Sequence, residues 1–156
     1  MNKFMTHTPA VNPSKGTVPA IICDMDHTLC HANGRHIYDY DKVDTDVPVL
    51  EVLSIVQSLL NAAEDGMALI ILTGREDTGK SMEMTSKWLL RHGLNPDLIL
   101  MRPKGDHRHS NVVKKELLEQ YALPRYKVLM IFEDSKRCAD TYREMGLKVI
   151  MPEINP

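Results

Sequence analysis

Short apolar runs alternate with helical patterns along most of this chain, and this alternation limits the possible folds more than any other feature. The predicted strands lie at 18–23, 67–73, 97–101, 126–132 and 147–151. The predicted helices lie at 47–66, 78–92, 110–121 and 135–145. Strands that are apolar throughout are typical of a parallel sheet covered by helices on both faces. The sequence therefore predicts an α/β domain with a five-stranded parallel sheet.

The N-terminus and the overall charge set the domain organisation. Residues 1–17 contain Pro, Thr, Asn, Ser and Gly without periodicity, so we expect a mobile tail there. Residues 18–156 are long enough to form a single domain with its own core. A net charge of −2 excludes binding of nucleic acid through an overall basic surface, so a polyanion would need a local positive patch.

The sequence shows neither a membrane-spanning segment nor a signal peptide. No run approaches the roughly 18 apolar residues of a membrane span, and the N-terminal stretch lacks an apolar core. The 3 cysteines have no paired spacing, which is typical of reduced thiols. We therefore expect a cytoplasmic protein.

Polar residues follow four of the predicted strands at the point where each strand ends. In chain order these are Asp24 and Asp26, then Thr73, Gly74 and Arg75, then Arg102, and finally Glu133 and Asp134. Ligands of open parallel sheets bind outside the carboxyl ends of the strands, which lie at one edge. We therefore expect these residues to line a common site.

The acidic residues of this set indicate a metal and acid–base chemistry. Asp24 and Asp26 flank Met25, so Met25 can point into the core while both carboxylates face one cleft. Glu133 and Asp134 add negative charge that requires a cation, and oxygen ligands suit Mg²⁺. A metal would allow one aspartate to act as a nucleophile while the other exchanges a proton.

A phosphate group fits the remaining residues. Thr73 with neighbouring backbone amides, together with a lysine such as Lys114, has the donors that phosphate oxygens require. The whole set therefore predicts phosphoryl transfer to an aspartate, in which positioning and charge neutralisation supply most of the catalysis.

Four short motifs resemble those of the haloacid dehalogenase (HAD) phosphohydrolases. These are "DMDHT" (24–28) for the DxDxT signature, "IILT" (70–73), "NVVKKE" (111–116) and "FED" (132–134). Further stretches, among them "NGR" (33–35), "DTDV" (44–47) and "GDHRHSNVVK" (105–114), resemble the 3′-phosphatase domain of phage polynucleotide kinase. The resemblance covers roughly residues 18–151.

This resemblance implies a role for each candidate residue. Asp24 would be the nucleophile that forms an aspartyl-phosphate. Asp26 would protonate the leaving hydroxyl and then activate the water that hydrolyses the intermediate. The residues that would bind substrate phosphate are Thr73, Gly74, Arg75, Arg102 and Lys114.

The resemblance also implies a magnesium cofactor and a particular sheet. Mg²⁺ would be bound by Asp24, the backbone carbonyl of Asp26 and Asp134, and Glu133 would act directly or through water. The five strands would lie in the order 5-4-1-2-3 in a Rossmann-like sheet. The chain between the first two strands is too short for a large cap, and members of this family without one leave the cleft open to macromolecular substrates.

Three features depart from the family pattern. His27 stands where glycine is common, so the turn after Asp26 is less free or the imidazole lines the cleft. Glu133 replaces the first aspartate of the usual acidic pair. The sequence contains no GxxxxGK[ST] loop, so we expect no P-loop kinase activity.

The function implied is a Mg²⁺-dependent phosphatase that removes 3′-phosphate from DNA or RNA ends, with a possible separate kinase or ligase as partner. One alternative is a phosphatase of small molecules such as nucleotides. A second alternative is a catalytically silent HAD-like binding module.

The basic residues near the expected cleft have more than one interpretation. Arg75 either binds phosphate or neutralises the acidic cluster, and Arg102 either binds phosphate or is a solvated loop charge. We expect Arg35, Lys104 or Arg108 to contact the phosphates of neighbouring nucleotides, which predicts a steep salt dependence.

Overall fold

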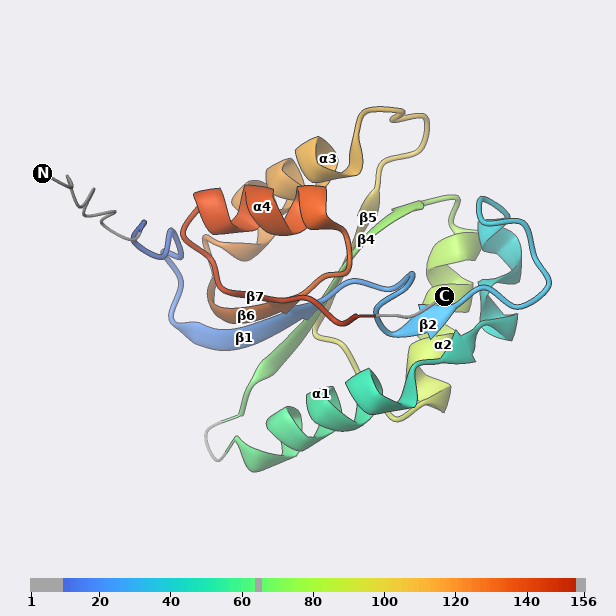
Figure 1. The fold of residues 1–156 in the computed structure, drawn as a ribbon, viewed down its shortest axis with the longest axis horizontal. Coiled ribbons are helices and arrows are strands. Elements are labelled where there is room, and N and C mark those ends of the chain that lie inside the picture. Colours follow the sequence, from blue (N-terminus) through green and yellow to red (C-terminus); the bar gives the residue numbers. More distant parts are fainter. Residues whose placement is uncertain (1–9, 64–65, 154–156) are drawn as a thin grey trace, which may run out of the picture.

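A five-stranded parallel sheet forms the centre of the domain in the computed structural model, which describes residues 10–63 and 66–153 (Figure 1). Its strands are β1 (Val18–Cys23), β4 (Ala68–Glu76), β5 (Leu98–Arg102), β6 (Tyr126–Phe132) and β7 (Val149–Ile150). β1 lies in the middle and pairs in parallel with β4 and β6. Its last four residues, 20–23, are buried because helices cover both faces of the sheet.

The order of the strands across the sheet is β5-β4-β1-β6-β7. The labels differ from those of the predicted order because two short strands, β2 (Cys30–His31) and β3 (Val47–Pro48), form a separate antiparallel pair. When these two are left out, each strand has the neighbours expected from the order 5-4-1-2-3. The carboxyl ends of β1 and β6 therefore lie side by side.

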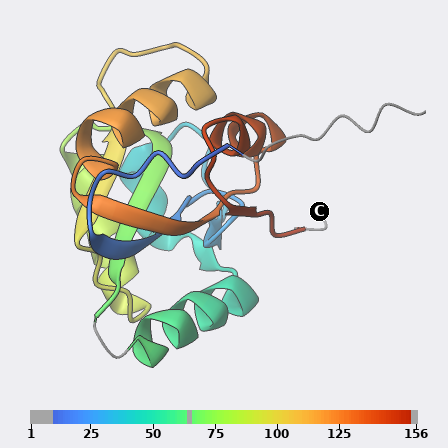
Figure 2. The ribbon, with the colours of Figure 1, turned by 90° about the vertical axis from the view of Figure 1, so that its left-hand side faces the viewer.

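Helices cover the sheet on both faces, as Figure 2 shows from the side. α1 (Leu50–Ala62) and α2 (Lys80–Arg91) pack on one face, and α3 (Ser110–Leu117) and α4 (Lys136–Glu144) pack on the other. A wider π-helical turn, η2 (Leu118–Ala122), continues α3. No helix in the described residues is both long and apolar enough to cross a membrane.

Two element boundaries near the site differ from the predicted ones. The helix predicted over 47–66 begins only at Leu50, because Val47 and Pro48 pair with β2 instead. The strand predicted over 67–73 continues to Glu76, with a shift of register after Thr73. The residues that follow Thr73 are therefore held at the edge of the sheet rather than in a free loop.

Residues 10–17 contain no helix or strand, yet part of this segment is bonded to the domain. Asn12 Nδ2 donates to the carbonyl of Val128 (2.9 Å), and Ser14 Oγ accepts from the Val128 N–H (3.0 Å). The Gly16 N–H donates to the Leu123 carbonyl (3.0 Å). The stretch 12–16 of the predicted mobile tail thus joins the folded domain, while residues 1–9 of that tail lie outside the described residues.

The segment between β1 and α1 forms a small flap, residues 30–48, and no large cap is present there. The flap contains β2, β3 and the 3₁₀ helix η1 (Tyr40–Thr45). It packs against α2, where Trp88 Nε1 donates to the backbone carbonyl of Asp46 (2.8 Å). The flap therefore lies beside the carboxyl edge of the sheet, where Tyr38 and Tyr40 border it.

Candidate active site

A cleft of about 670 Å³ lies at the carboxyl end of the sheet, between the strand ends and the flap. Seven of the nine predicted site residues line it: Asp24, Asp26, Gly74, Arg102, Lys114, Glu133 and Asp134. The other two, Thr73 and Arg75, are buried and lie behind it. The neighbouring ends of β1 and β6 account for this convergence, since the Asp24 N–H donates to the carbonyl of Phe132 (2.9 Å).

Asp24 is paired with a buried lysine. Lys114 Nζ, from α3, donates to Asp24 Oδ1 and to Glu133 Oε2, both at 2.8 Å. The neighbouring Lys115 is exposed and lies 3.9 Å from Glu119 Oε1. Lys114 is therefore the lysine of this helix that reaches the cleft, as its motif predicts.

Burial and charge perturb both members of this pair. Burial raises the pKa of Asp24 to about 8: the Lys114 charge opposes the rise, and the charges of Glu133 and Asp134 add to it. Burial lowers the pKa of Lys114, but the charges of Asp24 and Glu133 outweigh it and hold the pKa well above its usual value. One lysine thus compensates only part of the negative charge of three neighbouring carboxylates, and a cation is the group that would complete the balance.

The three carboxylates form a site of the right chemistry for Mg²⁺. Single oxygens of Asp24, Glu133 and Asp134 lie within 4.8 Å of one another. Both oxygens of Glu133 already accept hydrogen bonds, Oε2 from Lys114 and Oε1 from the Ser135 N–H (3.1 Å). Asp134 Oδ1, by contrast, has a long contact of 3.5 Å from Thr28 Oγ1. Asp24 Oδ2 likewise has only a long contact of 3.4 Å from Thr28 Oγ1. An all-oxygen donor set in which Asp134 and Asp24 each keep a weakly bonded oxygen fits a hard divalent cation.

Asp26 is held by two arginines. Arg75 donates from Nε to Oδ2 and from Nη2 to Oδ1, both at 2.9 Å, and Arg35 Nη2 donates to Oδ1 at 3.2 Å. Burial raises the pKa of Asp26, but the hydrogen bond and charge of Arg75 and the charge of Arg35 outweigh it, so the pKa lies below its usual value. The Asp26 side chain is still 34% exposed, so it remains accessible from the cleft.

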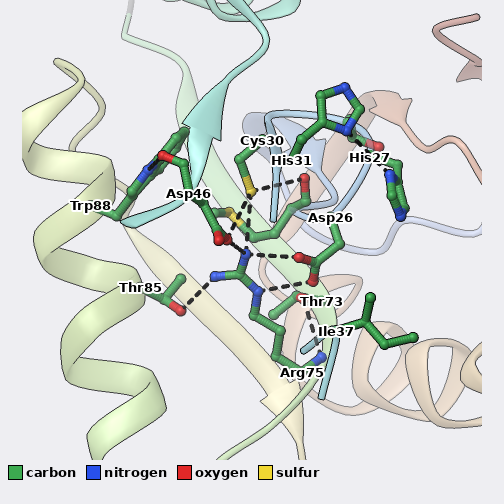
Figure 3. Close-up of polar contacts among 12 residues, drawn as sticks. Asp26, His27, Cys30, His31, Ile37, Asp46, Thr73, Arg75, Thr85 and Trp88 are labelled. Carbon is green, nitrogen blue, oxygen red and sulfur yellow. Dashed lines mark hydrogen bonds and ion pairs between the residues drawn. The ribbon is translucent and has the colours of Figure 1, made fainter. Parts of the chain in front are cut away.

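Arg75 is buried in a polar network and does not reach the cleft (Figure 3). Besides Asp26 it bonds Asp46 Oδ2 (2.7 Å) and Thr85 Oγ1 (3.0 Å). The guanidinium thus bonds two carboxylates and the Thr85 hydroxyl instead of facing the cleft, and its direct contact with substrate phosphate stays a prediction. This agrees with the alternative that Arg75 neutralises the acidic cluster.

Thr73 and Arg102 also differ from expectation. Thr73 is fully buried, and its Oγ1 accepts from the Arg75 N–H (3.2 Å), so it shapes the strand end instead of lining the cleft. Arg102 lines the cleft, but Nε donates to the Gly74 carbonyl (2.9 Å) and Nη2 to Ser110 Oγ (2.8 Å). A Cβ on Gly74 would lie 3.1 Å from Ser110 Oγ, which explains why glycine suits this position.

Two basic residues expected to meet neighbouring phosphates are engaged elsewhere. The Arg35 side chain is 1% exposed, and its Nε bonds Asp46 Oδ1 (2.6 Å). The Arg108 guanidinium forms ion pairs with Asp106 and Glu116, both at 2.8 Å. Lys104, the third residue of this prediction, is exposed on the loop after β5, so the predicted salt dependence rests mainly on Lys104 and stays a prediction.

The turn after Asp26 is strained at His27. His27 has a φ of 62°, in the left-handed region that glycine adopts readily. Its N–H donates to the Cys30 carbonyl (2.8 Å), and its ring faces His31 (Nδ1 to Nδ1, 3.2 Å). The expectation of a less free turn is met, while the ring lies beside His31 and not on the cleft wall.

Of the flap residues at the site, the sequence indicated only Arg35, and it did so for a contact with neighbouring phosphates rather than with Asp26. Arg35 and Asp46 hold Asp26 and Arg75, and Tyr38 and Tyr40 line the cleft. The stretches "NGR" and "DTDV" contain two of these residues, but no local pattern reveals that the flap folds back over β4. The available signal was that both stretches follow the "DMD" motif closely in the chain, within about twenty residues.

The fold and this site together define an HAD-type phosphatase domain. A family model described as "Polynucleotide kinase PNKP phosphatase domain" matches residues 18–153. The chain belongs to this family.

Similar proteins include a viral protein and chains of an RNA repair complex with solved structures. The protein "Putative bifunctional polynucleotide kinase/RNA ligase" of Autographa californica nuclear polyhedrosis virus is 26% identical over 133 residues, which are 84% of this chain and 19% of that protein. A chain of the "Pnkp1/Rnl/Hen1 RNA repair complex" matches with a TM-score of 0.82 and 30% identity over 96% of this chain and 47% of that chain. A chain of a second structure, "Pnkp1/Rnl/Hen1 complex", matches with a TM-score of 0.81 and 30% identity over 97% of this chain and 51% of that chain. The chain thus spans about half of these structural relatives or less.

Proposed function

We propose that this domain is a Mg²⁺-dependent phosphatase that removes 3′-phosphate from DNA or RNA ends through an aspartyl-phosphate on Asp24. The observation that carries the proposal is the pairing of Asp24 with Lys114 and of Asp26 with Arg75 at one cleft, in a domain of the polynucleotide kinase phosphatase family. This arrangement supplies a nucleophile, a proton donor and a phosphate-binding cation together.

The two aspartates divide the reaction. A carboxylate oxygen of Asp24 attacks phosphorus, and the bond between phosphorus and O3′ breaks. Asp26, whose pKa Arg75 and Arg35 hold low, would first take up a proton from solvent in the cleft and then give it to the departing O3′. Its carboxylate then takes a proton from the water that cleaves the acyl-phosphate, which restores Asp24 and releases phosphate. Arg75 and Arg35 orient Asp26 for both steps.

Phosphate oxygens would be bound by Lys114 Nζ and by groups of the cleft wall at Gly74 and Ser110. Lys114 is placed to neutralise charge that develops as Asp24 attacks, since its ammonium already touches Oδ1. Mg²⁺ would be held by Asp24 and Asp134, with the backbone carbonyl of Asp26 as a further oxygen ligand. When bound, it supplies charge neutralisation for the transferring phosphoryl group.

The metal assignment predicts a ranking of two variants. EDTA should abolish phosphate release and added Mg²⁺ should restore it. Asp134→Asn should raise the Mg²⁺ concentration needed for half-maximal rate by at least about tenfold, and by more than Glu133→Gln does, because both Glu133 oxygens already accept hydrogen bonds. Full activity in chelator, or the reverse ranking in a Mg²⁺ titration of the rate, would contradict the assignment.

The substrate assignment predicts a preference that kinetics can measure. A 3′-phosphorylated oligonucleotide should have a higher kcat/KM than the corresponding nucleoside 3′-phosphate or a 5′-phosphorylated oligonucleotide. Because Arg35 and Arg108 are engaged in ion pairs, the log–log slope of kcat/KM against salt should be shallow, about one or less. Equal or better turnover of small phosphate esters would favour the small-molecule alternative.

A kinase or ligase on a separate chain or domain is proposed as the partner. The viral relative is described as a polynucleotide kinase/RNA ligase, and the structural relatives are parts of an RNA repair complex. Removal of a 3′-phosphate leaves a 3′-hydroxyl, the end that a ligation step requires.

A further inference from the structure

Two tyrosines of the flap line the cleft without a role in the proposed chemistry. The rings of Tyr38 and Tyr40 have centroids 6.4 Å apart and planes at 86°. Tyr38 is 70% exposed and the adjacent Ile37 is 55% exposed. An aromatic ring stabilises a fold only through the surface that it buries, so the exposed ring of Tyr38 contributes little to this domain. Its face is available to a ligand in the cleft.

We propose that Tyr38, supported by Tyr40, forms a stacking subsite for the base of the nucleotide that carries the 3′-phosphate. Every nucleobase has a π-face, so stacking on a tyrosine binds an end without selecting its sequence. Neither neighbouring ring is stacked on Tyr38: Tyr40 is nearly perpendicular to it, and His36 is tilted (centroids 5.6 Å apart, planes at 48°). The inference rests on the proposed function, since it takes a nucleotide end as the ligand.

The subsite is tied to the group that protonates the leaving oxygen. Arg35 Nη1 donates to the carbonyls of His36 (3.2 Å) and Ile37 (3.1 Å), directly before Tyr38. The same guanidinium bonds Asp46 and Asp26. The backbone that carries the tyrosine is therefore fixed relative to Asp26, and a base stacked there would hold its own O3′ at a constant position in the cleft.

The charge of the cleft favours stacking over ionic contacts. Six Asp and Glu side chains line the cleft against three Lys and Arg side chains. The guanidinium of Arg102 donates to the carbonyls of Gly74 and Arg108, and that of Arg108 pairs with two carboxylates. Affinity for a nucleic acid end must therefore come in large part from an uncharged contact, and an exposed aromatic face supplies one.

Fluorescence binding tests the subsite directly. The probe is a 3′-phosphorylated oligonucleotide with 2-aminopurine as its last base, and the protein carries Asp24→Asn to prevent turnover. Stacking should quench the fluorescence on binding. Adding Tyr38→Ala should remove the quenching and raise Kd roughly tenfold, whereas Tyr38→Phe, which keeps the ring, should retain both. Tyr121→Ala, which removes an exposed ring of η2 that does not line the cleft, is the matched control and should change neither.

Kinetics with an abasic end separate stacking from a structural role. In otherwise wild-type protein, Tyr38→Ala should raise KM roughly tenfold for an ordinary 3′-phosphorylated end and leave KM unchanged for an end whose last nucleotide lacks a base. An equal penalty on both substrates, or no penalty, would overturn the subsite.

The outcomes distinguish the two proposals. Quenching that depends on Tyr38, without phosphate release by the wild-type protein, would support the subsite and overturn the proposed function. Phosphate release without quenching or base dependence would support the function and overturn the subsite. Failure of the oligonucleotide to bind at all would overturn both.

Discussion

Replacing Asp24 by asparagine should abolish phosphate release from a 3′-phosphorylated oligonucleotide. An amide cannot form the acyl-phosphate, so kcat should fall by at least about 10⁴-fold, the scale seen when a catalytic nucleophile is removed. Steady-state phosphate release at saturating substrate measures this loss. The matched control is Asp140→Asn, a change of the same kind at an aspartate exposed on α4, which should leave kcat unchanged.

The same variant should fold normally. In the protein without metal the pKa of Asp24 is raised to about 8 from an ordinary value of 3.8. The unfolded chain releases this proton near pH 3.8 and the folded protein only near pH 8, so the free energy of unfolding falls as the pH rises between these values. A neutral asparagine avoids this destabilisation and Lys114 keeps its bond to Glu133 Oε2 (2.8 Å), so the melting temperature in chelator at pH 7 should stay close to that of the wild type. Substantial turnover by this folded variant would exclude Asp24 as the nucleophile.

Replacing Asp46 by asparagine should strongly destabilise the domain. Its carboxylate is fully buried and accepts from Arg35 Nε (2.6 Å) and Arg75 Nη2 (2.7 Å). Removing one partner of a buried ion pair leaves the other charge uncompensated, which lowers the free energy of unfolding by about 3–5 kcal/mol. Urea unfolding measures the change. The exposed ion pair of Lys136 and Asp140 is the control, because Asp140→Asn should lower the free energy of unfolding by less than about 1 kcal/mol.

The Asp46 variant has a second readout in catalysis. Without Asp46, Arg75 and Arg35 lose the anchor that orients them toward Asp26, so kcat should fall more than KM rises. A loss of stability below about 1 kcal/mol together with an unchanged kcat would show that the network does not position Asp26.

The sheet was predictable because its strands are largely apolar runs, four of which end in polar residues. The strand neighbours and the gathering of Asp24, Lys114 and Asp134 at one edge followed from the rule for open parallel sheets and from the motif resemblance. Helix ends were less certain: Pro48 lies within a helical pattern yet pairs in β3, because tertiary contacts decide such boundaries.

The role of Arg75 could not be predicted from its place at a strand end. The direction of its side chain depends on Asp46 and Thr85, which belong to the flap and to α2. Position in the sequence places a residue at the edge of a sheet, but buried partners decide whether it faces substrate or supports an acid. The exposure of Tyr38 depends in the same way on how the flap folds over the cleft.

Transfer of a labelled phosphate to Asp24 is the sharpest test of the aspartyl-phosphate mechanism. An oligonucleotide with an isotopically labelled 3′-phosphate is mixed with the protein and Mg²⁺, quenched in acid within one turnover, and the peptides are analysed by mass spectrometry. We expect label on Asp24, and none with Asp24→Asn or when the labelled phosphate is at the 5′ end. Release of labelled phosphate without labelled Asp24, or equal labelling from the 5′ end, would contradict it.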